Sequence, residues 1–290
     1  MTITILDGGI SRELQRLGAP FRQPEWSALA LIETPQLVAQ VHDEFAAAGA
    51  HVISTNSYAV VPFHIGADRF ASDGAHLAAR AGELAQDVAA RRGIKVAASL
   101  PPVLGSYRPD LFEKTAAKAI LEVLVTALSP YADIWLAETL STVAEGELVA
   151  ELLVGDDRPL WLSFTLKDEG APALRSGETV ADAAALAKRV GAGALLFNCS
   201  APEVMEAAVA EAKGALSDSG IAIGVYANGF AAKAEDKDAN VDLQQIRADL
   251  DPSRYLDWAH KWVAAGATMV GGCCGIGVAH ITALAGGLRS

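Results

Sequence analysis

Residues 267–274 read Ala-Thr-Met-Val-Gly-Gly-Cys-Cys, an apolar run that finishes in two adjacent cysteines. A second run of the same kind, Gly191-Ala-Gly-Ala-Leu-Leu-Phe-Asn-Cys199, carries the remaining cysteine of the chain. Both runs are almost continuously hydrophobic rather than alternating, which is typical of parallel strands buried on both faces. The sequence therefore predicts two buried strands that end in sulfur.

Six further runs of this type come earlier in the chain, and amphipathic stretches separate them. The predicted strands are 3–6, 51–55, 95–100, 134–137, 160–165, 194–198, 222–226 and 268–272. The predicted helices are 35–48, 74–91, 114–128, 143–153, 179–190, 202–215, 252–265 and 278–288. Strict alternation of eight strands with eight helices predicts an α/β fold, the (βα)8 TIM barrel, with a doubly wound open sheet as the alternative. No linker or repeat divides the chain, so we expect one domain over residues 1–290.

Three connections, 56–73, 101–113 and 229–251, are longer than the others. Each follows a strand and precedes a helix, which places it at the C-terminal face where barrels carry their chemistry. All three are candidate lids over a site.

Composition excludes several classes of protein. The net charge of −12 makes nucleic acid an improbable partner. No run reaches the roughly 18 uncharged apolar residues of a membrane span, and the first residues lack the basic region of a secretory signal. Three cysteines, two of them adjacent, form a poor disulfide framework. We therefore expect a cytoplasmic protein in a reducing compartment; the sequence leaves its oligomeric state open.

Reactive side chains collect at the ends of the predicted strands. They are Asp7 after the first strand, Thr55 at the end of the second, Glu138 after the fourth, Cys199 after the sixth, Asn228 after the seventh, and Cys273 with Cys274 after the eighth. Three converging thiolates bind a soft or borderline cation, most often zinc. Three protein ligands leave a fourth tetrahedral position open, which is typical of a catalytic zinc.

The first strand adds a second kind of group. It ends in Asp7-Gly8-Gly9, where freed backbone N–H groups are suited to a ligand carboxylate. Asp7 and Glu138 together suit a ligand ammonium. A pocket with these groups and an open zinc position suits an amino acid that carries a thiol. The alternatives for each residue are structural: small buried hydrophobes for the cysteines, a turn cap for Asp7, an ion pair for Glu138 and a left-handed turn for Asn228.

With these motifs the chain resembles the homocysteine S-methyltransferase family from about residue 6 to residue 284. The resemblance rests on Leu6-Asp7-Gly8-Gly9, Asn198-Cys199 and the Gly-Gly-Cys-Cys of 271–274. It implies a (βα)8 barrel that uses one Zn²⁺ and methylates L-homocysteine to give methionine. The resemblance also implies a role for each matching residue. The zinc ligands are Cys199, Cys273 and Cys274, and the ammonium of homocysteine is held by Asp7 and Glu138. The carboxylate is held by Gly8 and Gly9, and the pocket is lined by Thr55, Tyr58 and Asn228.

The methyl donor implied by the resemblance is a small onium compound, S-methylmethionine or S-adenosylmethionine first, a betaine or dimethylsulfonium compound second. Tyr58, Tyr107 and Trp26 are candidates to face its positive charge. The chain departs from the family pattern at Ala227, where a proline is usual, at Gly275, where an arginine is common, and in the loop of the third strand. These departures leave the donor open. They also leave room for a non-catalytic zinc- or thiol-binding regulatory protein, and for a lyase or hydrolase with a zinc-activated thiol or water.

Overall fold

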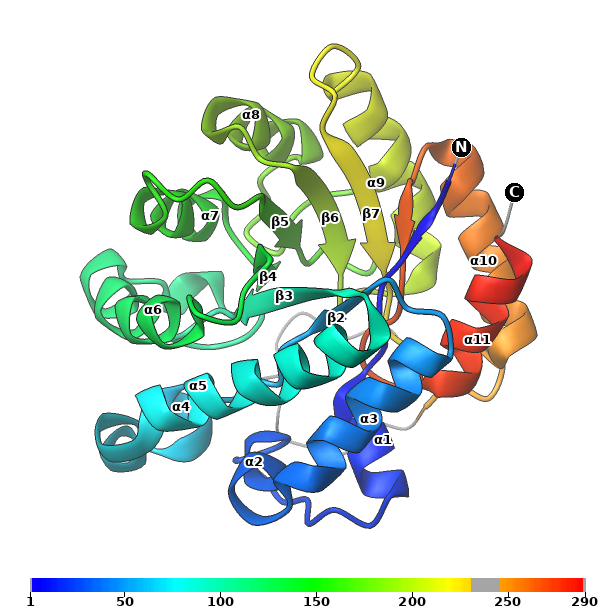
Figure 1. Ribbon diagram of the computed structural model, residues 1–290. Helices are drawn as coiled ribbons and strands as arrows, with labels where there is room; N and C mark the ends of the chain where they lie inside the picture. The colour runs from blue at the N-terminus through cyan, green and yellow to red at the C-terminus, as the bar shows by residue number, and fades with distance from the viewer. Residues whose placement is uncertain (1, 231–245, 289–290) are drawn as a thin grey trace.

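The computed structural model describes residues 2–230 and 246–288. Eight parallel strands lie at the centre, and helices surround them (Figure 1). The strands are β1 (Thr4–Ile5), β2 (Val52–Ser54), β3 (Lys95–Leu100), β4 (Ile134–Leu140), β5 (Leu160–Phe164), β6 (Ala194–Asn198), β7 (Ala222–Tyr226) and β8 (Met269–Val270). The helices of the outer ring are α3 (Pro35–Ala47), α5 (Ala67–Arg92), α6 (Lys114–Leu128), α7 (Val143–Leu152), α8 (Val180–Val190), α9 (Pro202–Ala215), α10 (Pro252–Ala265) and α11 (Val278–Gly287).

The sheet runs in the order β1-β8-β7-β6-β5-β4-β3-β2, so each strand lies beside its sequence neighbours and β8 lies beside β1. A parallel bridge between Leu6 and Val52 joins the two end strands. The His51 N–H adds a hydrogen bond to the Ile5 carbonyl at 2.8 Å across the same seam. The ring is thereby nearly closed, and the predicted (βα)8 barrel is confirmed.

Two hydrophobic layers stabilise the barrel. The inner layer fills the barrel interior with one inward-facing set of strand side chains, among them Leu136, Trp161 and Leu196. The outer layer packs the alternate strand residues against the helices, as with Phe164 and Phe197. The barrel interior is therefore a packed core, and any pocket must lie above it, at the ends of the strands.

Local sequence explains where several helices begin. The Thr142 side chain accepts from the Glu145 N–H at 3.1 Å while Glu145 accepts from the Thr142 N–H at 2.9 Å, a reciprocal cap for α7. The Asp251 carboxylate accepts from two N–H groups at the start of α10, and Pro252 occupies the first helical turn. These caps fix the starts of α7 and α10. Because each helix start follows a loop at a strand end, the caps also position the loops that carry the site.

The structure corrects the predicted segment 56–73. This stretch is not a long loop, because it contains α4 (Pro62–Ile65) and the first turns of α5. Gly74 suggested a helix start but lies inside α5, where a Cβ would be 2.8 Å from the Phe70 ring, so the ring packs over the bare backbone. Segment 101–113 is irregular with one 3-10 turn, Pro109–Leu111. Most of the predicted lid 229–251 lies outside the described residues.

Two more short helices were not predicted. They are α1 (Ile10–Arg16) and α2 (Ala28–Glu33), which lie between the first two strands. Within the residues described, no helix is long and apolar enough to cross a membrane.

Candidate metal and substrate site

A cavity of about 150 Å³ opens at the C-terminal end of the barrel. All the predicted site residues except Asn228 line it, and they come from the ends of β1, β2, β4, β6 and β8. Residues separated by more than 250 positions therefore meet in one hollow, as the barrel topology predicts.

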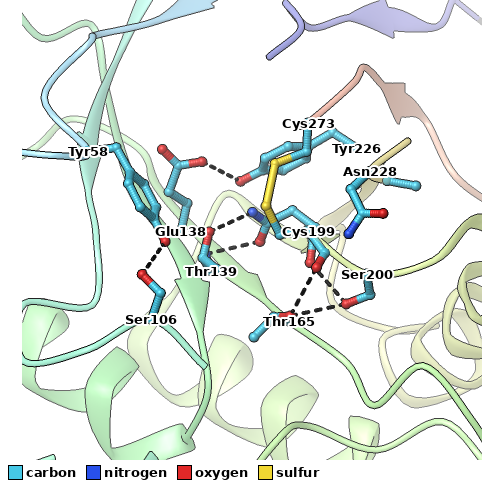
Figure 2. Close-up of a disulfide and its surroundings, with 12 residues drawn as sticks. Tyr58, Ser106, Glu138, Thr139, Thr165, Cys199, Ser200, Tyr226, Asn228 and Cys273 are labelled. Carbon is cyan, nitrogen blue, oxygen red and sulfur yellow. Dashed lines mark hydrogen bonds between the residues drawn. A yellow bond between two sulfur atoms is a disulfide. The ribbon is translucent and has the colours of Figure 1, made fainter. Parts of the chain in front are cut away.

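The three cysteines lie together on the wall of this cavity. Their Sγ atoms are all within 4.8 Å of one another. Cys199 and Cys273 are joined in a disulfide with a Cα–Cα distance of 5.7 Å (Figure 2), and Cys274 is outside it. The sequence predicted a poor disulfide framework, yet the structure joins two of the three cysteines. The physical reason is that residues brought close enough to share one cation are also close enough to be oxidised to a disulfide.

Glycines allow the strand end of β8 to approach β1. A Cβ at Gly271 would be 2.6 Å from the Leu6 Cβ, and one at Gly272 would be 2.2 Å from the Ile276 Cγ2. Both distances are below any normal contact, so only glycine fits. The Gly272 N–H then donates to the Asp7 carbonyl at 2.9 Å, which places Cys273 next to the end of β1.

Asp7 is a buried carboxylate on the floor of the cavity. Its Oδ2 accepts from the Ser54 N–H at 2.7 Å and its Oδ1 from the Ser54 hydroxyl at 3.1 Å. Burial, with a smaller contribution from the charge of Glu138, raises the pKa of Asp7 to about 7. The hydrogen bonds from Ser54 oppose this shift but are the weaker influence.

Glu138 is the second buried carboxylate. It accepts a hydrogen bond from the Ser99 hydroxyl. Figure 2 shows a second one, from the Tyr226 hydroxyl, whose length is 3.2 Å. Burial raises the pKa of Glu138 as well. Over the residues that the structure covers, neither Glu138 nor Asp7 forms an ion pair with a lysine or arginine. Arg12 also lines the cavity, but it is not paired with either acid. Two buried acids that no lysine or arginine of the described residues neutralises are suited to a cationic ligand.

Aromatic side chains form another part of the lining. The Tyr58 hydroxyl lies 2.7 Å from the Ser106 hydroxyl, and burial raises the pKa of Tyr58, so the ring stays a neutral phenol. Tyr107 and Trp26 line the same cavity, as does Phe21, whose ring meets Trp26 edge-on at 5.5 Å. The three rings expected to face a donor cation are therefore in one pocket with the carboxylates and cysteines.

The hydrogen bonding corrects one predicted ligand contact, that of Gly9. The Gly9 N–H donates to the Ile276 carbonyl at 2.8 Å, so this group is already used within the protein. A Cβ at Gly8 would be 2.4 Å from the same carbonyl oxygen, which shows that this glycine allows a close backbone contact. Sequence alone indicated a glycine-rich turn but not which backbone group it would bring near.

Asn228 is close to the site but does not line the cavity. Its Oδ1 accepts from the Phe230 N–H at 3.1 Å, and its own N–H donates to the Ser200 carbonyl at 3.1 Å. The side-chain oxygen of Asn228 therefore holds the turn after β7. Its φ is not among the positive values, so the left-handed turn considered for it is also wrong.

Three hydroxyl groups that position the carboxylates could not be recognised in the sequence. Ser54, Ser99 and Tyr226 lie within strands, where small polar or aromatic residues look like ordinary strand residues. His64, which the sequence analysis did not single out, also lines the cavity. Its Nδ1 lies 2.8 Å from the Pro24 carbonyl, and burial lowers the pKa of His64 to about 4, so the ring is neutral.

Backbone strain is concentrated around this cavity. Among the described residues, four that are not glycine have positive φ: Trp26 (49°), Tyr107 (63°), Thr139 (60°) and Cys199 (52°). All four line the cavity. Such conformations are unfavourable for residues with a Cβ, above all for a β-branched threonine. They persist where the surrounding contacts hold the backbone in place, and they are most common at functional sites.

A family model described as Homocysteine S-methyltransferase matches residues 4–288. The chain belongs to this family. Homocysteine S-methyltransferase of Escherichia coli (strain K12) is 33% identical, with 97% of this chain and 94% of the relative aligned. Homocysteine S-methyltransferase 3 of Arabidopsis thaliana is 29% identical over 93% of this chain and 85% of the relative. The family resemblance seen in the sequence is confirmed.

Solved structures agree with this assignment. The metallated form of the homocysteine methyltransferase MmuM from Escherichia coli superposes with a TM-score of 0.80 at 30% identity, covering 99% of this chain and 96% of that one. An oxidized form of the same protein superposes with a TM-score of 0.77 at 29% identity, covering 97% and 94%. The chain is therefore an enzyme of the homocysteine S-methyltransferase family, whose reaction is methyl transfer to homocysteine.

Proposed function

We propose that the protein is a zinc-dependent homocysteine S-methyltransferase that takes its methyl group from a small onium donor, S-methylmethionine or S-adenosylmethionine first. One observation carries the proposal: three cysteine sulfurs within 4.8 Å of one another share a cavity with two buried carboxylates. The whole chain, residues 1–290, acts in this proposal as one domain.

The cysteines suit a zinc ion. Tetrahedral zinc with Zn–S bonds of about 2.3 Å requires sulfurs roughly 3.8 Å apart. The Sγ atoms of Cys199, Cys273 and Cys274 are within 4.8 Å, so small side-chain rotations give the required spacing. When bound, Zn²⁺ keeps a coordinated thiol deprotonated at neutral pH and so supplies a thiolate nucleophile.

The disulfide must be reduced before the set is complete. A reducing thiol delivers two electrons to the Cys199–Cys273 bond, which yields two cysteine thiols and oxidises the reductant. Both thiols then lose their protons on binding a metal. We therefore place the active form in a reducing compartment such as the cytoplasm.

Asp7 and Glu138 are proposed to hold the ammonium of L-homocysteine. Their burial raises both pKa values, and that of Asp7 reaches about 7. An ammonium between them offsets this cost, so substrate binding favours the ionised form of both carboxyls. Ser54, Ser99 and Tyr226 hold the carboxylates in place through the hydrogen bonds described above.

The aromatic side chains are proposed to receive the donor. Trp26, Tyr58 and Tyr107 present neutral rings to the cavity, and cation–π contact stabilises an onium group by roughly 0.5–2 kcal/mol. The homocysteine sulfur forms a bond to the methyl carbon while the bond between that carbon and the onium sulfur breaks. The electron pair of the broken bond stays on the donor sulfur, which leaves as a neutral thioether.

A betaine or dimethylsulfonium donor with the same acceptor remains the second proposal, since the same rings bind any onium group. Membership of an enzyme family argues against the non-catalytic alternative. The amino-acid-binding position of Asp7 and Glu138 argues against the lyase or hydrolase alternative.

The test is methionine production by the reduced, zinc-loaded protein with L-homocysteine and one donor at a time. The panel is S-methylmethionine, S-adenosylmethionine, glycine betaine and dimethylsulfoniopropionate. Turnover with either of the first two supports the proposal. Turnover with glycine betaine or dimethylsulfoniopropionate alone moves the assignment to the second proposal. No methionine from any of them, with homocysteine bound and zinc in place, contradicts both.

A further inference from the structure

Asn198 lies at the end of β6, beneath the cavity, and is fully buried. Its Oδ1 accepts from the Thr139 N–H at 3.0 Å, and its Nδ2 donates to the Thr139 hydroxyl at 2.8 Å. The Ser163 hydroxyl donates to the same Oδ1 at 2.8 Å. One amide side chain thus ties the ends of β4, β5 and β6 together. Asn198 itself does not line the cavity, whereas Thr139 does.

The backbone that Asn198 holds is unusual. Thr139 has φ of 60°, a left-handed conformation that a β-branched residue rarely adopts. The pairing of β4 with β5 changes register here, because Ala137 pairs with Leu162 while Leu140 pairs with Phe164. Between these two pairs β4 moves on by three residues while β5 moves on by two. The extra residue in β4 forms a β-bulge, a feature that changes side-chain direction and is common beside active sites. The N–H and the hydroxyl of Thr139 both bond to Asn198.

The residues on either side of this contact belong to the site. Glu138 immediately precedes Thr139, and Cys199 immediately follows Asn198 with a positive φ of its own, 52°. Figure 2 shows Glu138, Thr139 and Cys199 grouped around the disulfide. The Asn198–Thr139 contact therefore connects the segment that carries a carboxylate to the segment that carries a sulfur ligand.

We propose that Asn198 is a positioning residue: it holds Thr139 in its left-handed conformation and thereby sets the distance between Glu138 and Cys199. This inference rests on the proposed function, in which Glu138 holds the substrate ammonium and Cys199 is a metal ligand. An acceptor bound at its ammonium and at its sulfur spans these two residues. The Asn198–Thr139 contact therefore determines whether both ends of the acceptor reach their partners together.

A double-mutant cycle tests this assignment. Asn198→Ala removes both bonds to Thr139, and we expect it to weaken zinc affinity and to raise KM for homocysteine roughly tenfold to hundredfold, while KM for the donor stays unchanged. Thr139→Gly supplies a residue that adopts positive φ without strain. In that background the same Asn198→Ala change is expected to cost much less, because the turn no longer needs to be held.

Ser163→Ala is the matched control, since it removes the third hydrogen bond of the Asn198 side chain and leaves both bonds to Thr139. It is expected to cost less than Asn198→Ala. Thermal unfolding verifies that each variant is folded. If Asn198→Ala does not fold, Asn198→Asp replaces it in the same cycle, because aspartate loses the amide donor to the Thr139 hydroxyl.

Equal costs of Asn198→Ala in the two backgrounds would mean that the side chain only fills the core, and would overturn the inference. Unchanged zinc affinity and unchanged KM in the folded single variant would do the same. Zinc affinity, measured by competition with a chelator, needs no turnover. If the unaltered protein makes no methionine, the proposed function fails. The double-mutant cycle measured by zinc affinity would still support or overturn the role of Asn198.

Discussion

Asp7→Asn is expected to stabilise the protein while weakening its binding of homocysteine. Burial raises the pKa of Asp7 from 3.8 to about 7. The unfolded chain therefore releases this proton at lower pH than the folded protein does, and stability falls as pH rises between the two values. Each pKa unit corresponds to about 1.4 kcal/mol, so ionised Asp7 costs the metal-free protein roughly 4 kcal/mol when the group is fully charged.

Asparagine keeps an acceptor for the Ser54 N–H and carries no charge. The variant is expected to exceed the original protein in unfolding free energy by roughly 2 kcal/mol at about pH 5.5 and by roughly 4 kcal/mol at about pH 8. The assay is urea unfolding of the reduced, metal-free protein at both pH values. Isothermal titration with homocysteine in the zinc-loaded form measures the loss of binding.

Glu145→Gln is the matched control for this experiment. Burial also raises the pKa of Glu145 to about 7, but this residue caps α7 away from the cavity. It should show the same direction of pH-dependent stabilisation with homocysteine affinity unchanged. A difference between Asp7→Asn and the original protein that does not grow with pH would refute the reasoning about buried charge. Unchanged homocysteine affinity would refute the role of Asp7.

Three further predictions follow from the site. Glu138→Gln should raise KM for homocysteine by about thirtyfold or more, since losing one partner of a buried charge pair costs about 2 kcal/mol or more, with zinc content unchanged; a normal KM would contradict the assignment. Protein that carries the Cys199–Cys273 disulfide should show one titratable thiol and bind no zinc. After reduction it should show three thiols and bind one zinc, as measured by thiol titration and metal analysis. Stoichiometric zinc binding before reduction would contradict this. Tyr58→Ala should raise KM for the onium donor by roughly twofold to thirtyfold while Tyr58→Phe keeps it, because the ring and not the hydroxyl faces the cation; equal effects of both changes in steady-state kinetics would contradict this.

The strands could be predicted because each is a short, continuous apolar run that parallel packing requires. The helices α1 and α2 could not, since seven and six residues are too short to show a clear period of 3.6. The start of α5 was predicted wrongly at Gly74 for a different reason. Glycine usually marks a helix end, but here the Phe70 ring occupies the space that a Cβ would fill.

The site was predictable where chemistry alone selects the residue. Cysteines and carboxylates at strand ends are rare enough to be noticed, and they do line the cavity. Their supporting groups were not predictable, because Ser54, Ser99 and Asn198 act through strand register and bulge geometry that only the folded chain fixes. The same holds for Gly9, whose N–H is taken by Ile276, a residue more than 260 positions away.

The most direct test of this account is X-ray absorption spectroscopy of the reduced, zinc-loaded protein before and after L-homocysteine is added. We expect three sulfurs and one lighter atom around zinc in the free protein, and four sulfurs at about 2.3 Å with homocysteine. A zinc environment that does not gain a sulfur, or zinc held by nitrogen and oxygen ligands in place of the three cysteines, would contradict it.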